Sequence, residues 1–381
     1  MKKAVIIGAG NLGRGLLGIE LSRNDYCLAF IDKDPNIVKS LNKNKGYAVN
    51  FFGPRHPEKV TIEHAYSTDQ PAEICGAILR ADLLFTAVGA QNLKSAGEII
   101  SSAYRGLTYR RSAYRKSEKP GIVVACENVP ENSARLKEHI RLERRCQENL
   151  EFANCVVDRI CLSRDGSLIV EDPFEWIIET TRQIGKGKIR DGQIGEGIRT
   201  TKNLRPYFAR KQFLVNGLHG ILGYAGNFHG VSYVHDAVNH PTIRALIEEA
   251  SEEMEWAIRL EYGYSRRELS NYAKQVMARF ANPEVEDGTA RLVRDPIRKL
   301  QVGERFMAPA LLAYSHGIYP ENICKGIAYL LLYHGDDQGK QIEAMLKEDG
   351  VLSALSNYTG LDQDHPIIQE ISRQYYTLEK K

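Results

Sequence analysis

The chain has 381 residues, of which 43% are hydrophobic and 26% charged, and 51 basic against 48 acidic side chains give it a formal net charge of +3. This length is typical of two domains, and this composition is typical of a water-soluble globular protein with a sizeable core. A net charge so near neutral does not favour a protein that binds nucleic acid or a membrane surface. We therefore expect neither partner, and the composition predicts no particular oligomeric state.

The cysteines and the N-terminal residues both indicate a cytoplasmic protein. The seven cysteines are odd in number and no two have Cys-x-x-Cys spacing, so reduced thiols are the simplest interpretation. The apolar run after Met1-Lys2-Lys3 already ends at Gly8, which makes it too short for the core of a signal peptide. No stretch reaches the roughly 18 apolar residues of a membrane-spanning helix.

Short apolar runs alternate with helical patterns through the first half of the chain. Such runs, each of a strand's length, are typical of a parallel sheet that is covered by helices on both faces. Asp165-Gly166, after the last run, predicts a tight turn, and the basic stretch at 105–119 is interpreted as a solvated loop. The apolar runs lie at 4–7, 28–32, 83–89, 121–126 and 156–162.

From about residue 195 the pattern becomes helical. Asn239-His240-Pro241 is typical of a helix start, and apolar residues then recur at three-and-four spacing as far as Ile258 and again from Ile323 to Leu331. A glycine-rich segment at 185–197 predicts a flexible connection, so we place the two domains at 1–195 and 196–381. The expected fold is an α/β, Rossmann-type doubly wound sheet followed by a mainly α-helical C-terminal domain.

The first apolar run leads into the segment Gly8-Ala9-Gly10-Asn11-Leu12-Gly13, which fits the pattern GxGxxG of dinucleotide-binding loops. In such a loop Gly8 permits the tight turn, Gly10 lets a pyrophosphate approach the backbone, and Gly13 lets the following helix pack on the strand. Asp32 ends the second run, 24 residues after Gly8, where a carboxylate would accept hydrogen bonds from the adenosine ribose hydroxyls. These features predict a dinucleotide cofactor.

Asp32 also favours NAD over NADP. A carboxylate at this place repels a 2′-phosphate, by roughly 1–4 kcal/mol between unit charges in contact, depending on the effective dielectric constant. Lys33 follows immediately and would soften this discrimination. NAD is therefore the expected cofactor.

A second group of polar residues, Lys211, Asn216 and His219, lies in the helical half. On an α-helix Asn216 and His219 share a face, and Lys211 lies within about 140° of both. Alcohol oxidation needs a base for the hydroxyl proton and donors for the partly negative oxygen, which a lysine and an asparagine can supply. On spacing alone, a surface lysine and a structural histidine explain the pattern equally well.

The chain resembles the polyol-specific long-chain dehydrogenases, a family whose catalytic signature is matched by Lys211-x4-Asn216-x2-His219. The glycine loop and its continuation Arg14-Gly15 are similar to the cofactor loop of that family, and the resemblance runs nearly from end to end. Further similar segments are Thr86-Ala87-Val88-Gly89, Ala125-Cys126-Glu127-Asn128, Val157-Asp158-Arg159-Ile160, Asp295-Pro296-Ile297-Arg298-Lys299-Leu300 and Asp336-Asp337. The catalytic signature is specific to the family, whereas the glycine loop is not.

The resemblance implies a role for each matching residue. Lys211 would be the general acid/base, and Asn128 would join Asn216 in holding the substrate oxygen. Substrate contacts are expected from His219, Asp158, Arg298 and Lys299, and cofactor contacts from Gly8, Gly10, Asn11, Leu12, Gly13, Asp32, Val88 and Gly89. Such enzymes use no zinc, and His229 and His235, which have no carboxylate or cysteine in register, are interpreted as structural.

The resemblance implies oxidation of a sugar alcohol, or of its phosphate ester, to the ketose. The basic residues Arg294, Arg298, Lys299 and Arg305 favour an anionic substrate, but some of them could pair with Asp295 and Glu304 instead. A free polyol such as mannitol or arabinitol, or a hexuronate, remains an alternative within the same fold. A non-catalytic NAD-binding sensor is the alternative from another class, although a sensor would need no lysine, asparagines and histidine together.

Overall fold

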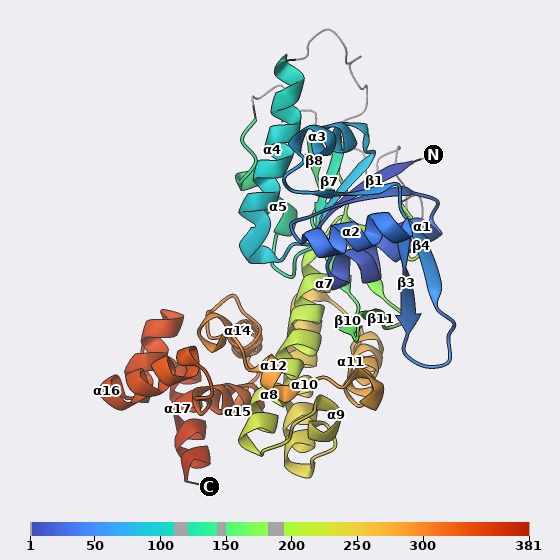
Figure 1. The fold of residues 1–381 in the computed structure, drawn as a ribbon. Coiled ribbons are helices and arrows are strands. Elements are labelled where there is room, and N and C mark those ends of the chain that lie inside the picture. Colours follow the sequence, from blue (N-terminus) through green and yellow to red (C-terminus); the bar gives the residue numbers. More distant parts are fainter. Residues whose placement is uncertain (1, 110–120, 143–149, 182–193, 381) are drawn as a thin grey trace. The chain divides into compact units, whose positions relative to one another are not determined.

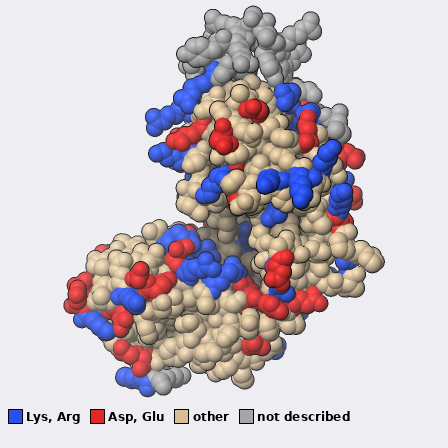
Figure 2. Space-filling view, viewed as in Figure 1, with Lys and Arg blue, Asp and Glu red and all other residues tan. Residues whose placement is uncertain are grey.

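The computed structural model describes residues 2–109, 121–142, 150–181 and 194–380, and the chain divides into two compact units, Met1–Arg205 and Pro206–Lys381. Basic and acidic side chains are interspersed over the face seen in Figure 2, in keeping with the near-neutral net charge. Parts of the predicted basic loop and glycine-rich connection lie outside the described residues, namely Arg110, Arg111, Arg115, Lys116, Lys119, Gly185, Gly187 and Gly192.

A parallel sheet forms the centre of the first unit. Its strands are β1 Lys3–Ile7, β2 Cys27–Asp32, β5 His64–Ser67, β6 Leu83–Thr86, β7 Gly121–Ala125 and β8 Leu150–Phe152. They are ordered β5-β2-β1-β6-β7-β8, and every neighbouring pair is parallel. β2 and β5 extend the sheet on one side of β1, and β6, β7 and β8 extend it on the other side. This is the doubly wound arrangement. The predicted α/β sheet is therefore confirmed.

Helices cover both faces of this sheet because alternate residues of each strand point to opposite sides. Val5 and Ile7 of β1 belong to one apolar cluster, with α3 Pro71–Arg80, α4 Leu93–Tyr109 and α5 Asn132–Glu138. Ala4 and Ile6 belong to a second cluster, on the other face, with the π-helix η1 Gly13–Gly18, α1 Ile19–Arg23 and α2 Pro35–Asn44. Figure 1 shows these two helical layers.

Two smaller sheets complete the first unit. The sheet β10-β11-β3-β4 consists of Cys161–Arg164, Ser167–Val170, Gly46–Phe51 and Glu58–Thr61, and the sheet β13-β12-β9 of Ile198–Thr201, Glu175–Glu179 and Cys155–Asp158. The turn predicted at Asp165-Gly166 is confirmed: both residues have positive φ, 49° and 77°, and they join the antiparallel strands β10 and β11. Such φ values are typical of a type I′ hairpin turn.

The single strand expected at 156–162 is wrong. The chain forms β9 there, leaves the sheet at Arg159-Ile160, and then begins β10 in the other small sheet. The charged pair Asp158-Arg159 interrupts the apolar run at this break, and the residues on both sides of the pair are suited to strands. At the break, the side chain of Arg159 is not exposed at all and donates to Glu20 and to the carbonyl oxygen of Glu171.

The second unit is mainly helical, as predicted, and its described residues also include an isolated β-bridge between Tyr233 and Gly288. The predicted start at Asn239-His240-Pro241 is confirmed, with His240 as the N-cap of a helix whose apolar stripe is buried, and so is the stripe from Ile323 to Leu331. No helix among the described residues is both long enough and apolar enough to cross a membrane. The helices from Arg205 onward are α7 Arg205–Arg210, η3 Lys211–Gly217, α8 Leu218–Phe228, α9 Val234–Ala237, α10 Pro241–Tyr262, α11 Arg266–Phe280, η4 Pro283–Val285, α12 Thr289–Leu292, α13 Pro296–Lys299, α14 Met307–Ser315, α15 Glu321–Leu331, α16 Asp337–Thr359 and α17 Pro366–Glu379.

Candidate active site

The glycine loop lies between β1 and η1, and its three glycines serve different purposes. Gly8 has φ of 103°, and a Cβ there would lie 2.4 Å from the carbonyl oxygen of Ala87. A Cβ at Gly13 would lie 1.9 Å from the carbonyl oxygen of Gly8. Both positions therefore require glycine for the packing of the loop itself. A Cβ at Gly10 would meet no atom of the described residues within 4 Å, so this position is open to a ligand.

Asp32, the last residue of β2, is tied directly to this loop. The backbone N–H of Ala9 donates to its Oδ2 at 2.6 Å, and the N–H of Asp34 donates to its Oδ1 at 2.9 Å. Each carboxylate oxygen has a second acceptor direction. The carboxylate can therefore hold the loop and still accept a hydrogen bond from a ribose hydroxyl, which is the role that the sequence predicts.

The segment Val88-Gly89, which follows β6, is held by a residue that the sequence analysis did not single out. Glu127 is buried, and its carboxylate accepts hydrogen bonds from the Thr86 hydroxyl at 2.8 Å and from the Val88 N–H at 2.9 Å. Burial raises the pKa of Glu127 above its usual value. Glu127 therefore binds the predicted cofactor segment at Val88 and directly precedes Asn128, which is predicted to hold the substrate oxygen. The sequence signal that could have identified Glu127 is a charged residue directly after an apolar run.

Asn128 and Asp158 are the other predicted residues of the first unit. Asn128 follows β7 and is exposed, whereas Asp158 is the last residue of β9 and is half-buried. Asp158 stands opposite Glu175 in the antiparallel pairing of β9 with β12. Both predicted residues thus stand at or just beyond the end of a strand.

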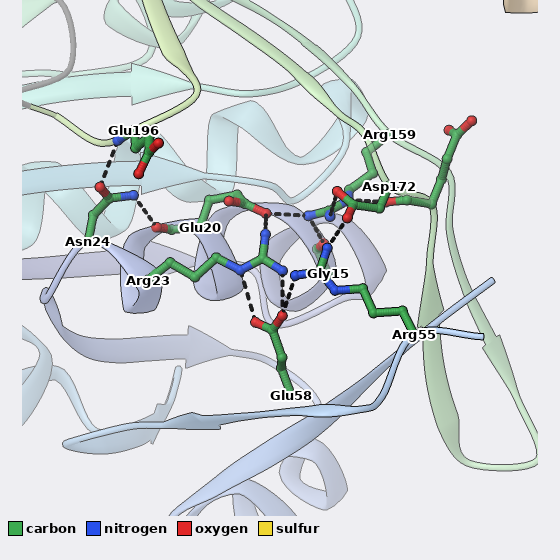
Figure 3. Close-up of polar contacts among 10 residues, drawn as sticks. Gly15, Glu20, Arg23, Asn24, Arg55, Glu58, Arg159, Asp172 and Glu196 are labelled. Atoms are coloured by element: carbon green, nitrogen blue, oxygen red, sulfur yellow. Dashed lines mark hydrogen bonds and ion pairs between the residues drawn. The ribbon is translucent and has the colours of Figure 1, made fainter. Parts of the chain in front are cut away.

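Arg159, which follows Asp158, anchors the helical run after the glycine loop (Figure 3). Its Nη1 donates to Glu20 Oε1 at 2.7 Å and to the carbonyl oxygen of Gly15 at 3.1 Å, while its Nε donates to the carbonyl oxygen of Glu171 at 2.6 Å. The side chains of Arg159 and Glu20 are 0% and 3% exposed. This buried ion pair therefore fixes η1 and α1 against the hairpin strands.

In the second unit, Lys211, Asn216 and His219 lie on one helical run formed by α7, η3 and α8. Lys211 is buried, whereas Asn216 and His219 are half-buried. The segment Lys211–Gly217 is a π-helix, in which hydrogen bonds join residues five apart, and π-helical turns are frequent at functional sites.

The π-helix changes the geometry that we expected for Lys211. On a regular α-helix, residues five apart are separated by about 140° around the axis. In a π-helix, residues five apart are about one turn apart, as residues four apart are in an α-helix. The wider turn therefore brings Lys211 and Asn216 closer to one line along the helix than the predicted α-helix would.

His219 contacts an acidic residue that the sequence analysis did not identify. Its Nε2 lies 2.9 Å from Oδ2 of Asp287, and its ring stacks on Phe280 with 4.8 Å between centroids. Arg291 donates to both oxygens of the same carboxylate, at 2.7 and 2.6 Å. Burial lowers the pKa of His219, and this effect exceeds the opposing influence of Asp287. Burial alone would raise the pKa of Asp287, but its hydrogen bonds to His219 and Arg291 hold it well below its usual range.

Arg298 and Lys299, the predicted substrate contacts on α13, differ in their surroundings. Arg298 is exposed, and its guanidinium donates to Glu304 at 2.7 Å. Lys299 is buried, and its ammonium donates to the carbonyl oxygens of Leu292, at 2.5 Å, and of Arg294. Burial, together with the charges of Arg305 and Arg298, lowers the pKa of Lys299 to about 7. Of the two, Arg298 has the more accessible charge.

The described residues include no group of three or more histidine, cysteine, aspartate or glutamate side chains that could hold a metal ion. His229, interpreted from the sequence as structural, has its Nε2 3.3 Å from the Tyr329 hydroxyl. His235 has its Nε2 3.6 Å from Asp236. Each of these histidines therefore has a neighbouring polar group within the second unit.

A Rossmann-type unit with an acidic residue at the end of β2, followed by a helical unit in which Lys211 is buried, is typical of a two-domain dehydrogenase. Residues 2–190 match the mannitol dehydrogenase Rossmann domain and residues 203–379 match the mannitol dehydrogenase C-terminal domain. The chain therefore belongs to the mannitol dehydrogenase family, which confirms the resemblance inferred from its motifs.

Relatives match the chain over its full length. The mannitol-1-phosphate 5-dehydrogenase of Caldanaerobacter subterraneus subsp. tengcongensis is 34% identical over 396 aligned residues, which cover 100% of both chains. That of Anoxybacillus flavithermus is also 34% identical and covers 97% of this chain and 98% of its own. Among solved structures, Pseudomonas fluorescens mannitol 2-dehydrogenase superposes with a TM-score of 0.76 at 16% identity, covering 99% of this chain and 92% of its own, and shares the fold.

Proposed function

We propose that this enzyme oxidises mannitol 1-phosphate reversibly to fructose 6-phosphate, with NAD as cofactor, Lys211 as general acid/base and no metal ion. The observation that carries the proposal is the full-length similarity to mannitol-1-phosphate 5-dehydrogenases at 34% identity. The substrate is thus a phosphorylated polyol rather than a free polyol or a hexuronate. We place the reaction in the cytoplasm, a setting that the six described cysteines, all free thiols, support.

The first unit fits NAD at its glycine loop. The open space at Gly10 suits a pyrophosphate, and the positive end of the following helical run favours its charge. Asp32 would bind the adenosine ribose, while Val88 and Gly89 would line the cofactor. When bound, NAD accepts the hydride that leaves the substrate carbon.

Lys211 would take the hydroxyl proton as the carbonyl forms. The C–H bond breaks with its electron pair, the O–H proton passes to the uncharged amine of Lys211, and a C=O double bond results. Burial of a lysine disfavours its charged form, which suits a base. Asn216 and Asn128 carry amide N–H donors that can hold the partly negative oxygen during this change.

Replacement of Asp32 by serine should weaken the preference for NAD. The serine removes the charge that repels a 2′-phosphate, so the ratio of kcat/KM with NAD to kcat/KM with NADP should fall roughly 5- to 150-fold, as loss of about 1–3 kcal/mol of repulsion implies. The measurement is a pair of saturation curves for each enzyme. A wild-type enzyme that works faster with NADP would show that Asp32 does not face the ribose.

Replacement of Arg298 by alanine should raise KM for mannitol 1-phosphate and fructose 6-phosphate far more than KM for free polyols. A guanidinium suits the planar, paired contacts of a phosphate, and breaking a charge-assisted contact costs about 1.5–3 kcal/mol, or roughly 10- to 150-fold in KM. Arg244 is the matched control, because it is also exposed and paired with a glutamate, Glu248, at 2.9 Å. Equal effects of Arg298→Ala on phosphorylated and free substrates would assign Arg298 to folding or to hydroxyl binding.

The experiment that tests the proposed function is an absorbance assay at the nicotinamide band over a panel of free polyols, hexitol phosphates and hexuronates. We expect the highest kcat/KM with mannitol 1-phosphate. Turnover of mannitol or arabinitol above that of their phosphates, or turnover of a hexuronate alone, would contradict the assignment of a phosphorylated substrate. The assignment of a dehydrogenase activity would remain. No turnover of any of these, with NAD still bound, would instead indicate a cofactor-binding sensor.

A further inference from the structure

His219 is held by a carboxylate to which the proposed reaction assigns no role. Asp287 is only 9% exposed, and Arg291 donates to both of its oxygens. A carboxylate paired in this way with a guanidinium remains ionised near neutral pH, and an ionised carboxylate can only accept hydrogen bonds. The ring nitrogen that faces it, His219 Nε2 at 2.9 Å, must therefore carry a proton.

This contact determines which nitrogen of His219 is available to a ligand. A neutral imidazole has one donor and one acceptor nitrogen, and a hydrogen bond at one fixes the character of the other. With the proton on Nε2, the lone pair lies on Nδ1. Phe280 stacks on the ring face and restricts the rotation of the ring. Nδ1 is therefore a hydrogen-bond acceptor that points in a fixed direction.

We propose that Asp287 is a positioning residue of the enzyme, which holds His219 in its Nε2-protonated form so that Nδ1 accepts a hydrogen bond from a hydroxyl of the polyol. The proposal rests on the proposed function for its ligand but not for its geometry. Arg291 keeps the carboxylate ionised and aligned. Besides Asp287, the charged groups that act on His219 are Arg291 and Arg279, and both disfavour a charged imidazole.

The form of His219 can be measured without any substrate. In enzyme labelled with ¹⁵N-histidine, the two ring nitrogens have different chemical shifts when protonated and unprotonated, and His219→Gln identifies the signals of His219. At mildly alkaline pH we expect the wild type to show Nε2 protonated and Nδ1 unprotonated, and Asp287→Ala to lose this preference. A wild-type His219 that is protonated on Nδ1, or signals unchanged in Asp287→Ala, would overturn the proposal whatever the substrate proves to be.

Kinetics of the same variants test whether the contact matters for the reaction. We expect Asp287→Ala to lower kcat/KM roughly 10- to 100-fold, as for the carboxylate partners of metal-bound histidines. The decrease in kcat/KM should divide between KM and kcat in the same proportion as in His219→Ala. The variant that carries both substitutions should have the same kcat/KM as His219→Ala alone, because Asp287 acts through His219. Additive losses, or a wild-type kcat/KM in Asp287→Ala, would contradict this role.

A matched control is available elsewhere in the second unit. Glu261 lies 2.8 Å from Nε2 of His316, so that Glu261→Ala also removes the carboxylate partner of a histidine, and it should leave kcat and KM unchanged. Asp287→Asn serves as the second variant if Asp287→Ala does not fold, since it keeps the side-chain shape but not the charge. The tautomer of wild-type His219 tests the proposal in either case.

Discussion

Lys211→Ala should lower kcat by roughly 10²–10⁴, the usual contribution of a positioned proton transfer. Oxidation by the wild type should become faster with increasing pH until the lysine is deprotonated, because only the uncharged amine accepts the substrate proton. In Lys211→Ala this rise should disappear, and an added small primary amine should restore part of the rate. Steady-state rates across pH, with and without the amine, are the measurement.

Two further variants isolate the proton transfer from other roles of Lys211. Lys211→Arg should fail as well, because a guanidinium stays charged and cannot act as a base. Lys347, which is 73% exposed, provides a lysine whose replacement by alanine should leave kcat unchanged. The affinity for NADH should barely change in any of them, since the predicted cofactor contacts all lie in the first unit. A near-normal kcat and an unchanged pH profile in Lys211→Ala would show that the base is elsewhere, with His219 the next candidate.

Glu20→Met should lower the free energy of unfolding of the first unit by about 3–5 kcal/mol, because it leaves the buried guanidinium of Arg159 without its closest carboxylate. The double variant with Arg159→Met should recover part of this loss, since no uncompensated charge then remains buried. Glu63, partly exposed and paired with Lys3 at 2.8 Å, is the control; Glu63→Gln should cost less than about 1 kcal/mol.

Tryptophan fluorescence can report on the unfolding of the first unit separately from the second. It has two tryptophans, of which Trp176 is fully buried in the first unit and Trp256 is 45% exposed in the second. In a Trp256→Phe background, urea unfolding monitored by fluorescence reports on Trp176 alone. A double variant no more stable than Glu20→Met would show that the buried charge is not the cause of the loss.

The central sheet and the glycine loop could be predicted because the information is local. Each buried strand is a short apolar run, and Gly8, Gly13 and Asp32 occur at spacings that a strand–loop–helix unit imposes. The long helices of the second unit were predictable for a similar reason, since their apolar stripes repeat at helical spacing. These features depend on residues that are close together in the sequence.

The remaining parts of the site depend on contacts between distant residues. Asp287 lies 68 positions after His219, and Arg159 lies 139 positions after Glu20, so no spacing rule connects either pair. The break between β9 and β10 lies at Arg159, whose buried side chain contacts Glu20 and Gly15, both far away in the sequence. The π-helix at Lys211 was also missed, because the apolar spacing of η3 suits an α-helix equally well.

The most direct test of the proposed function is to identify the product formed from fructose 6-phosphate and NADH. We expect NADH to be consumed in proportion to the ketose phosphate, and NMR of the purified product to show mannitol 1-phosphate alone. Formation of the epimeric hexitol phosphate, glucitol 6-phosphate, would contradict the assigned stereochemistry. No reaction with fructose 6-phosphate, while free fructose or a keto-hexuronate is reduced, would contradict the assignment of a phosphorylated substrate.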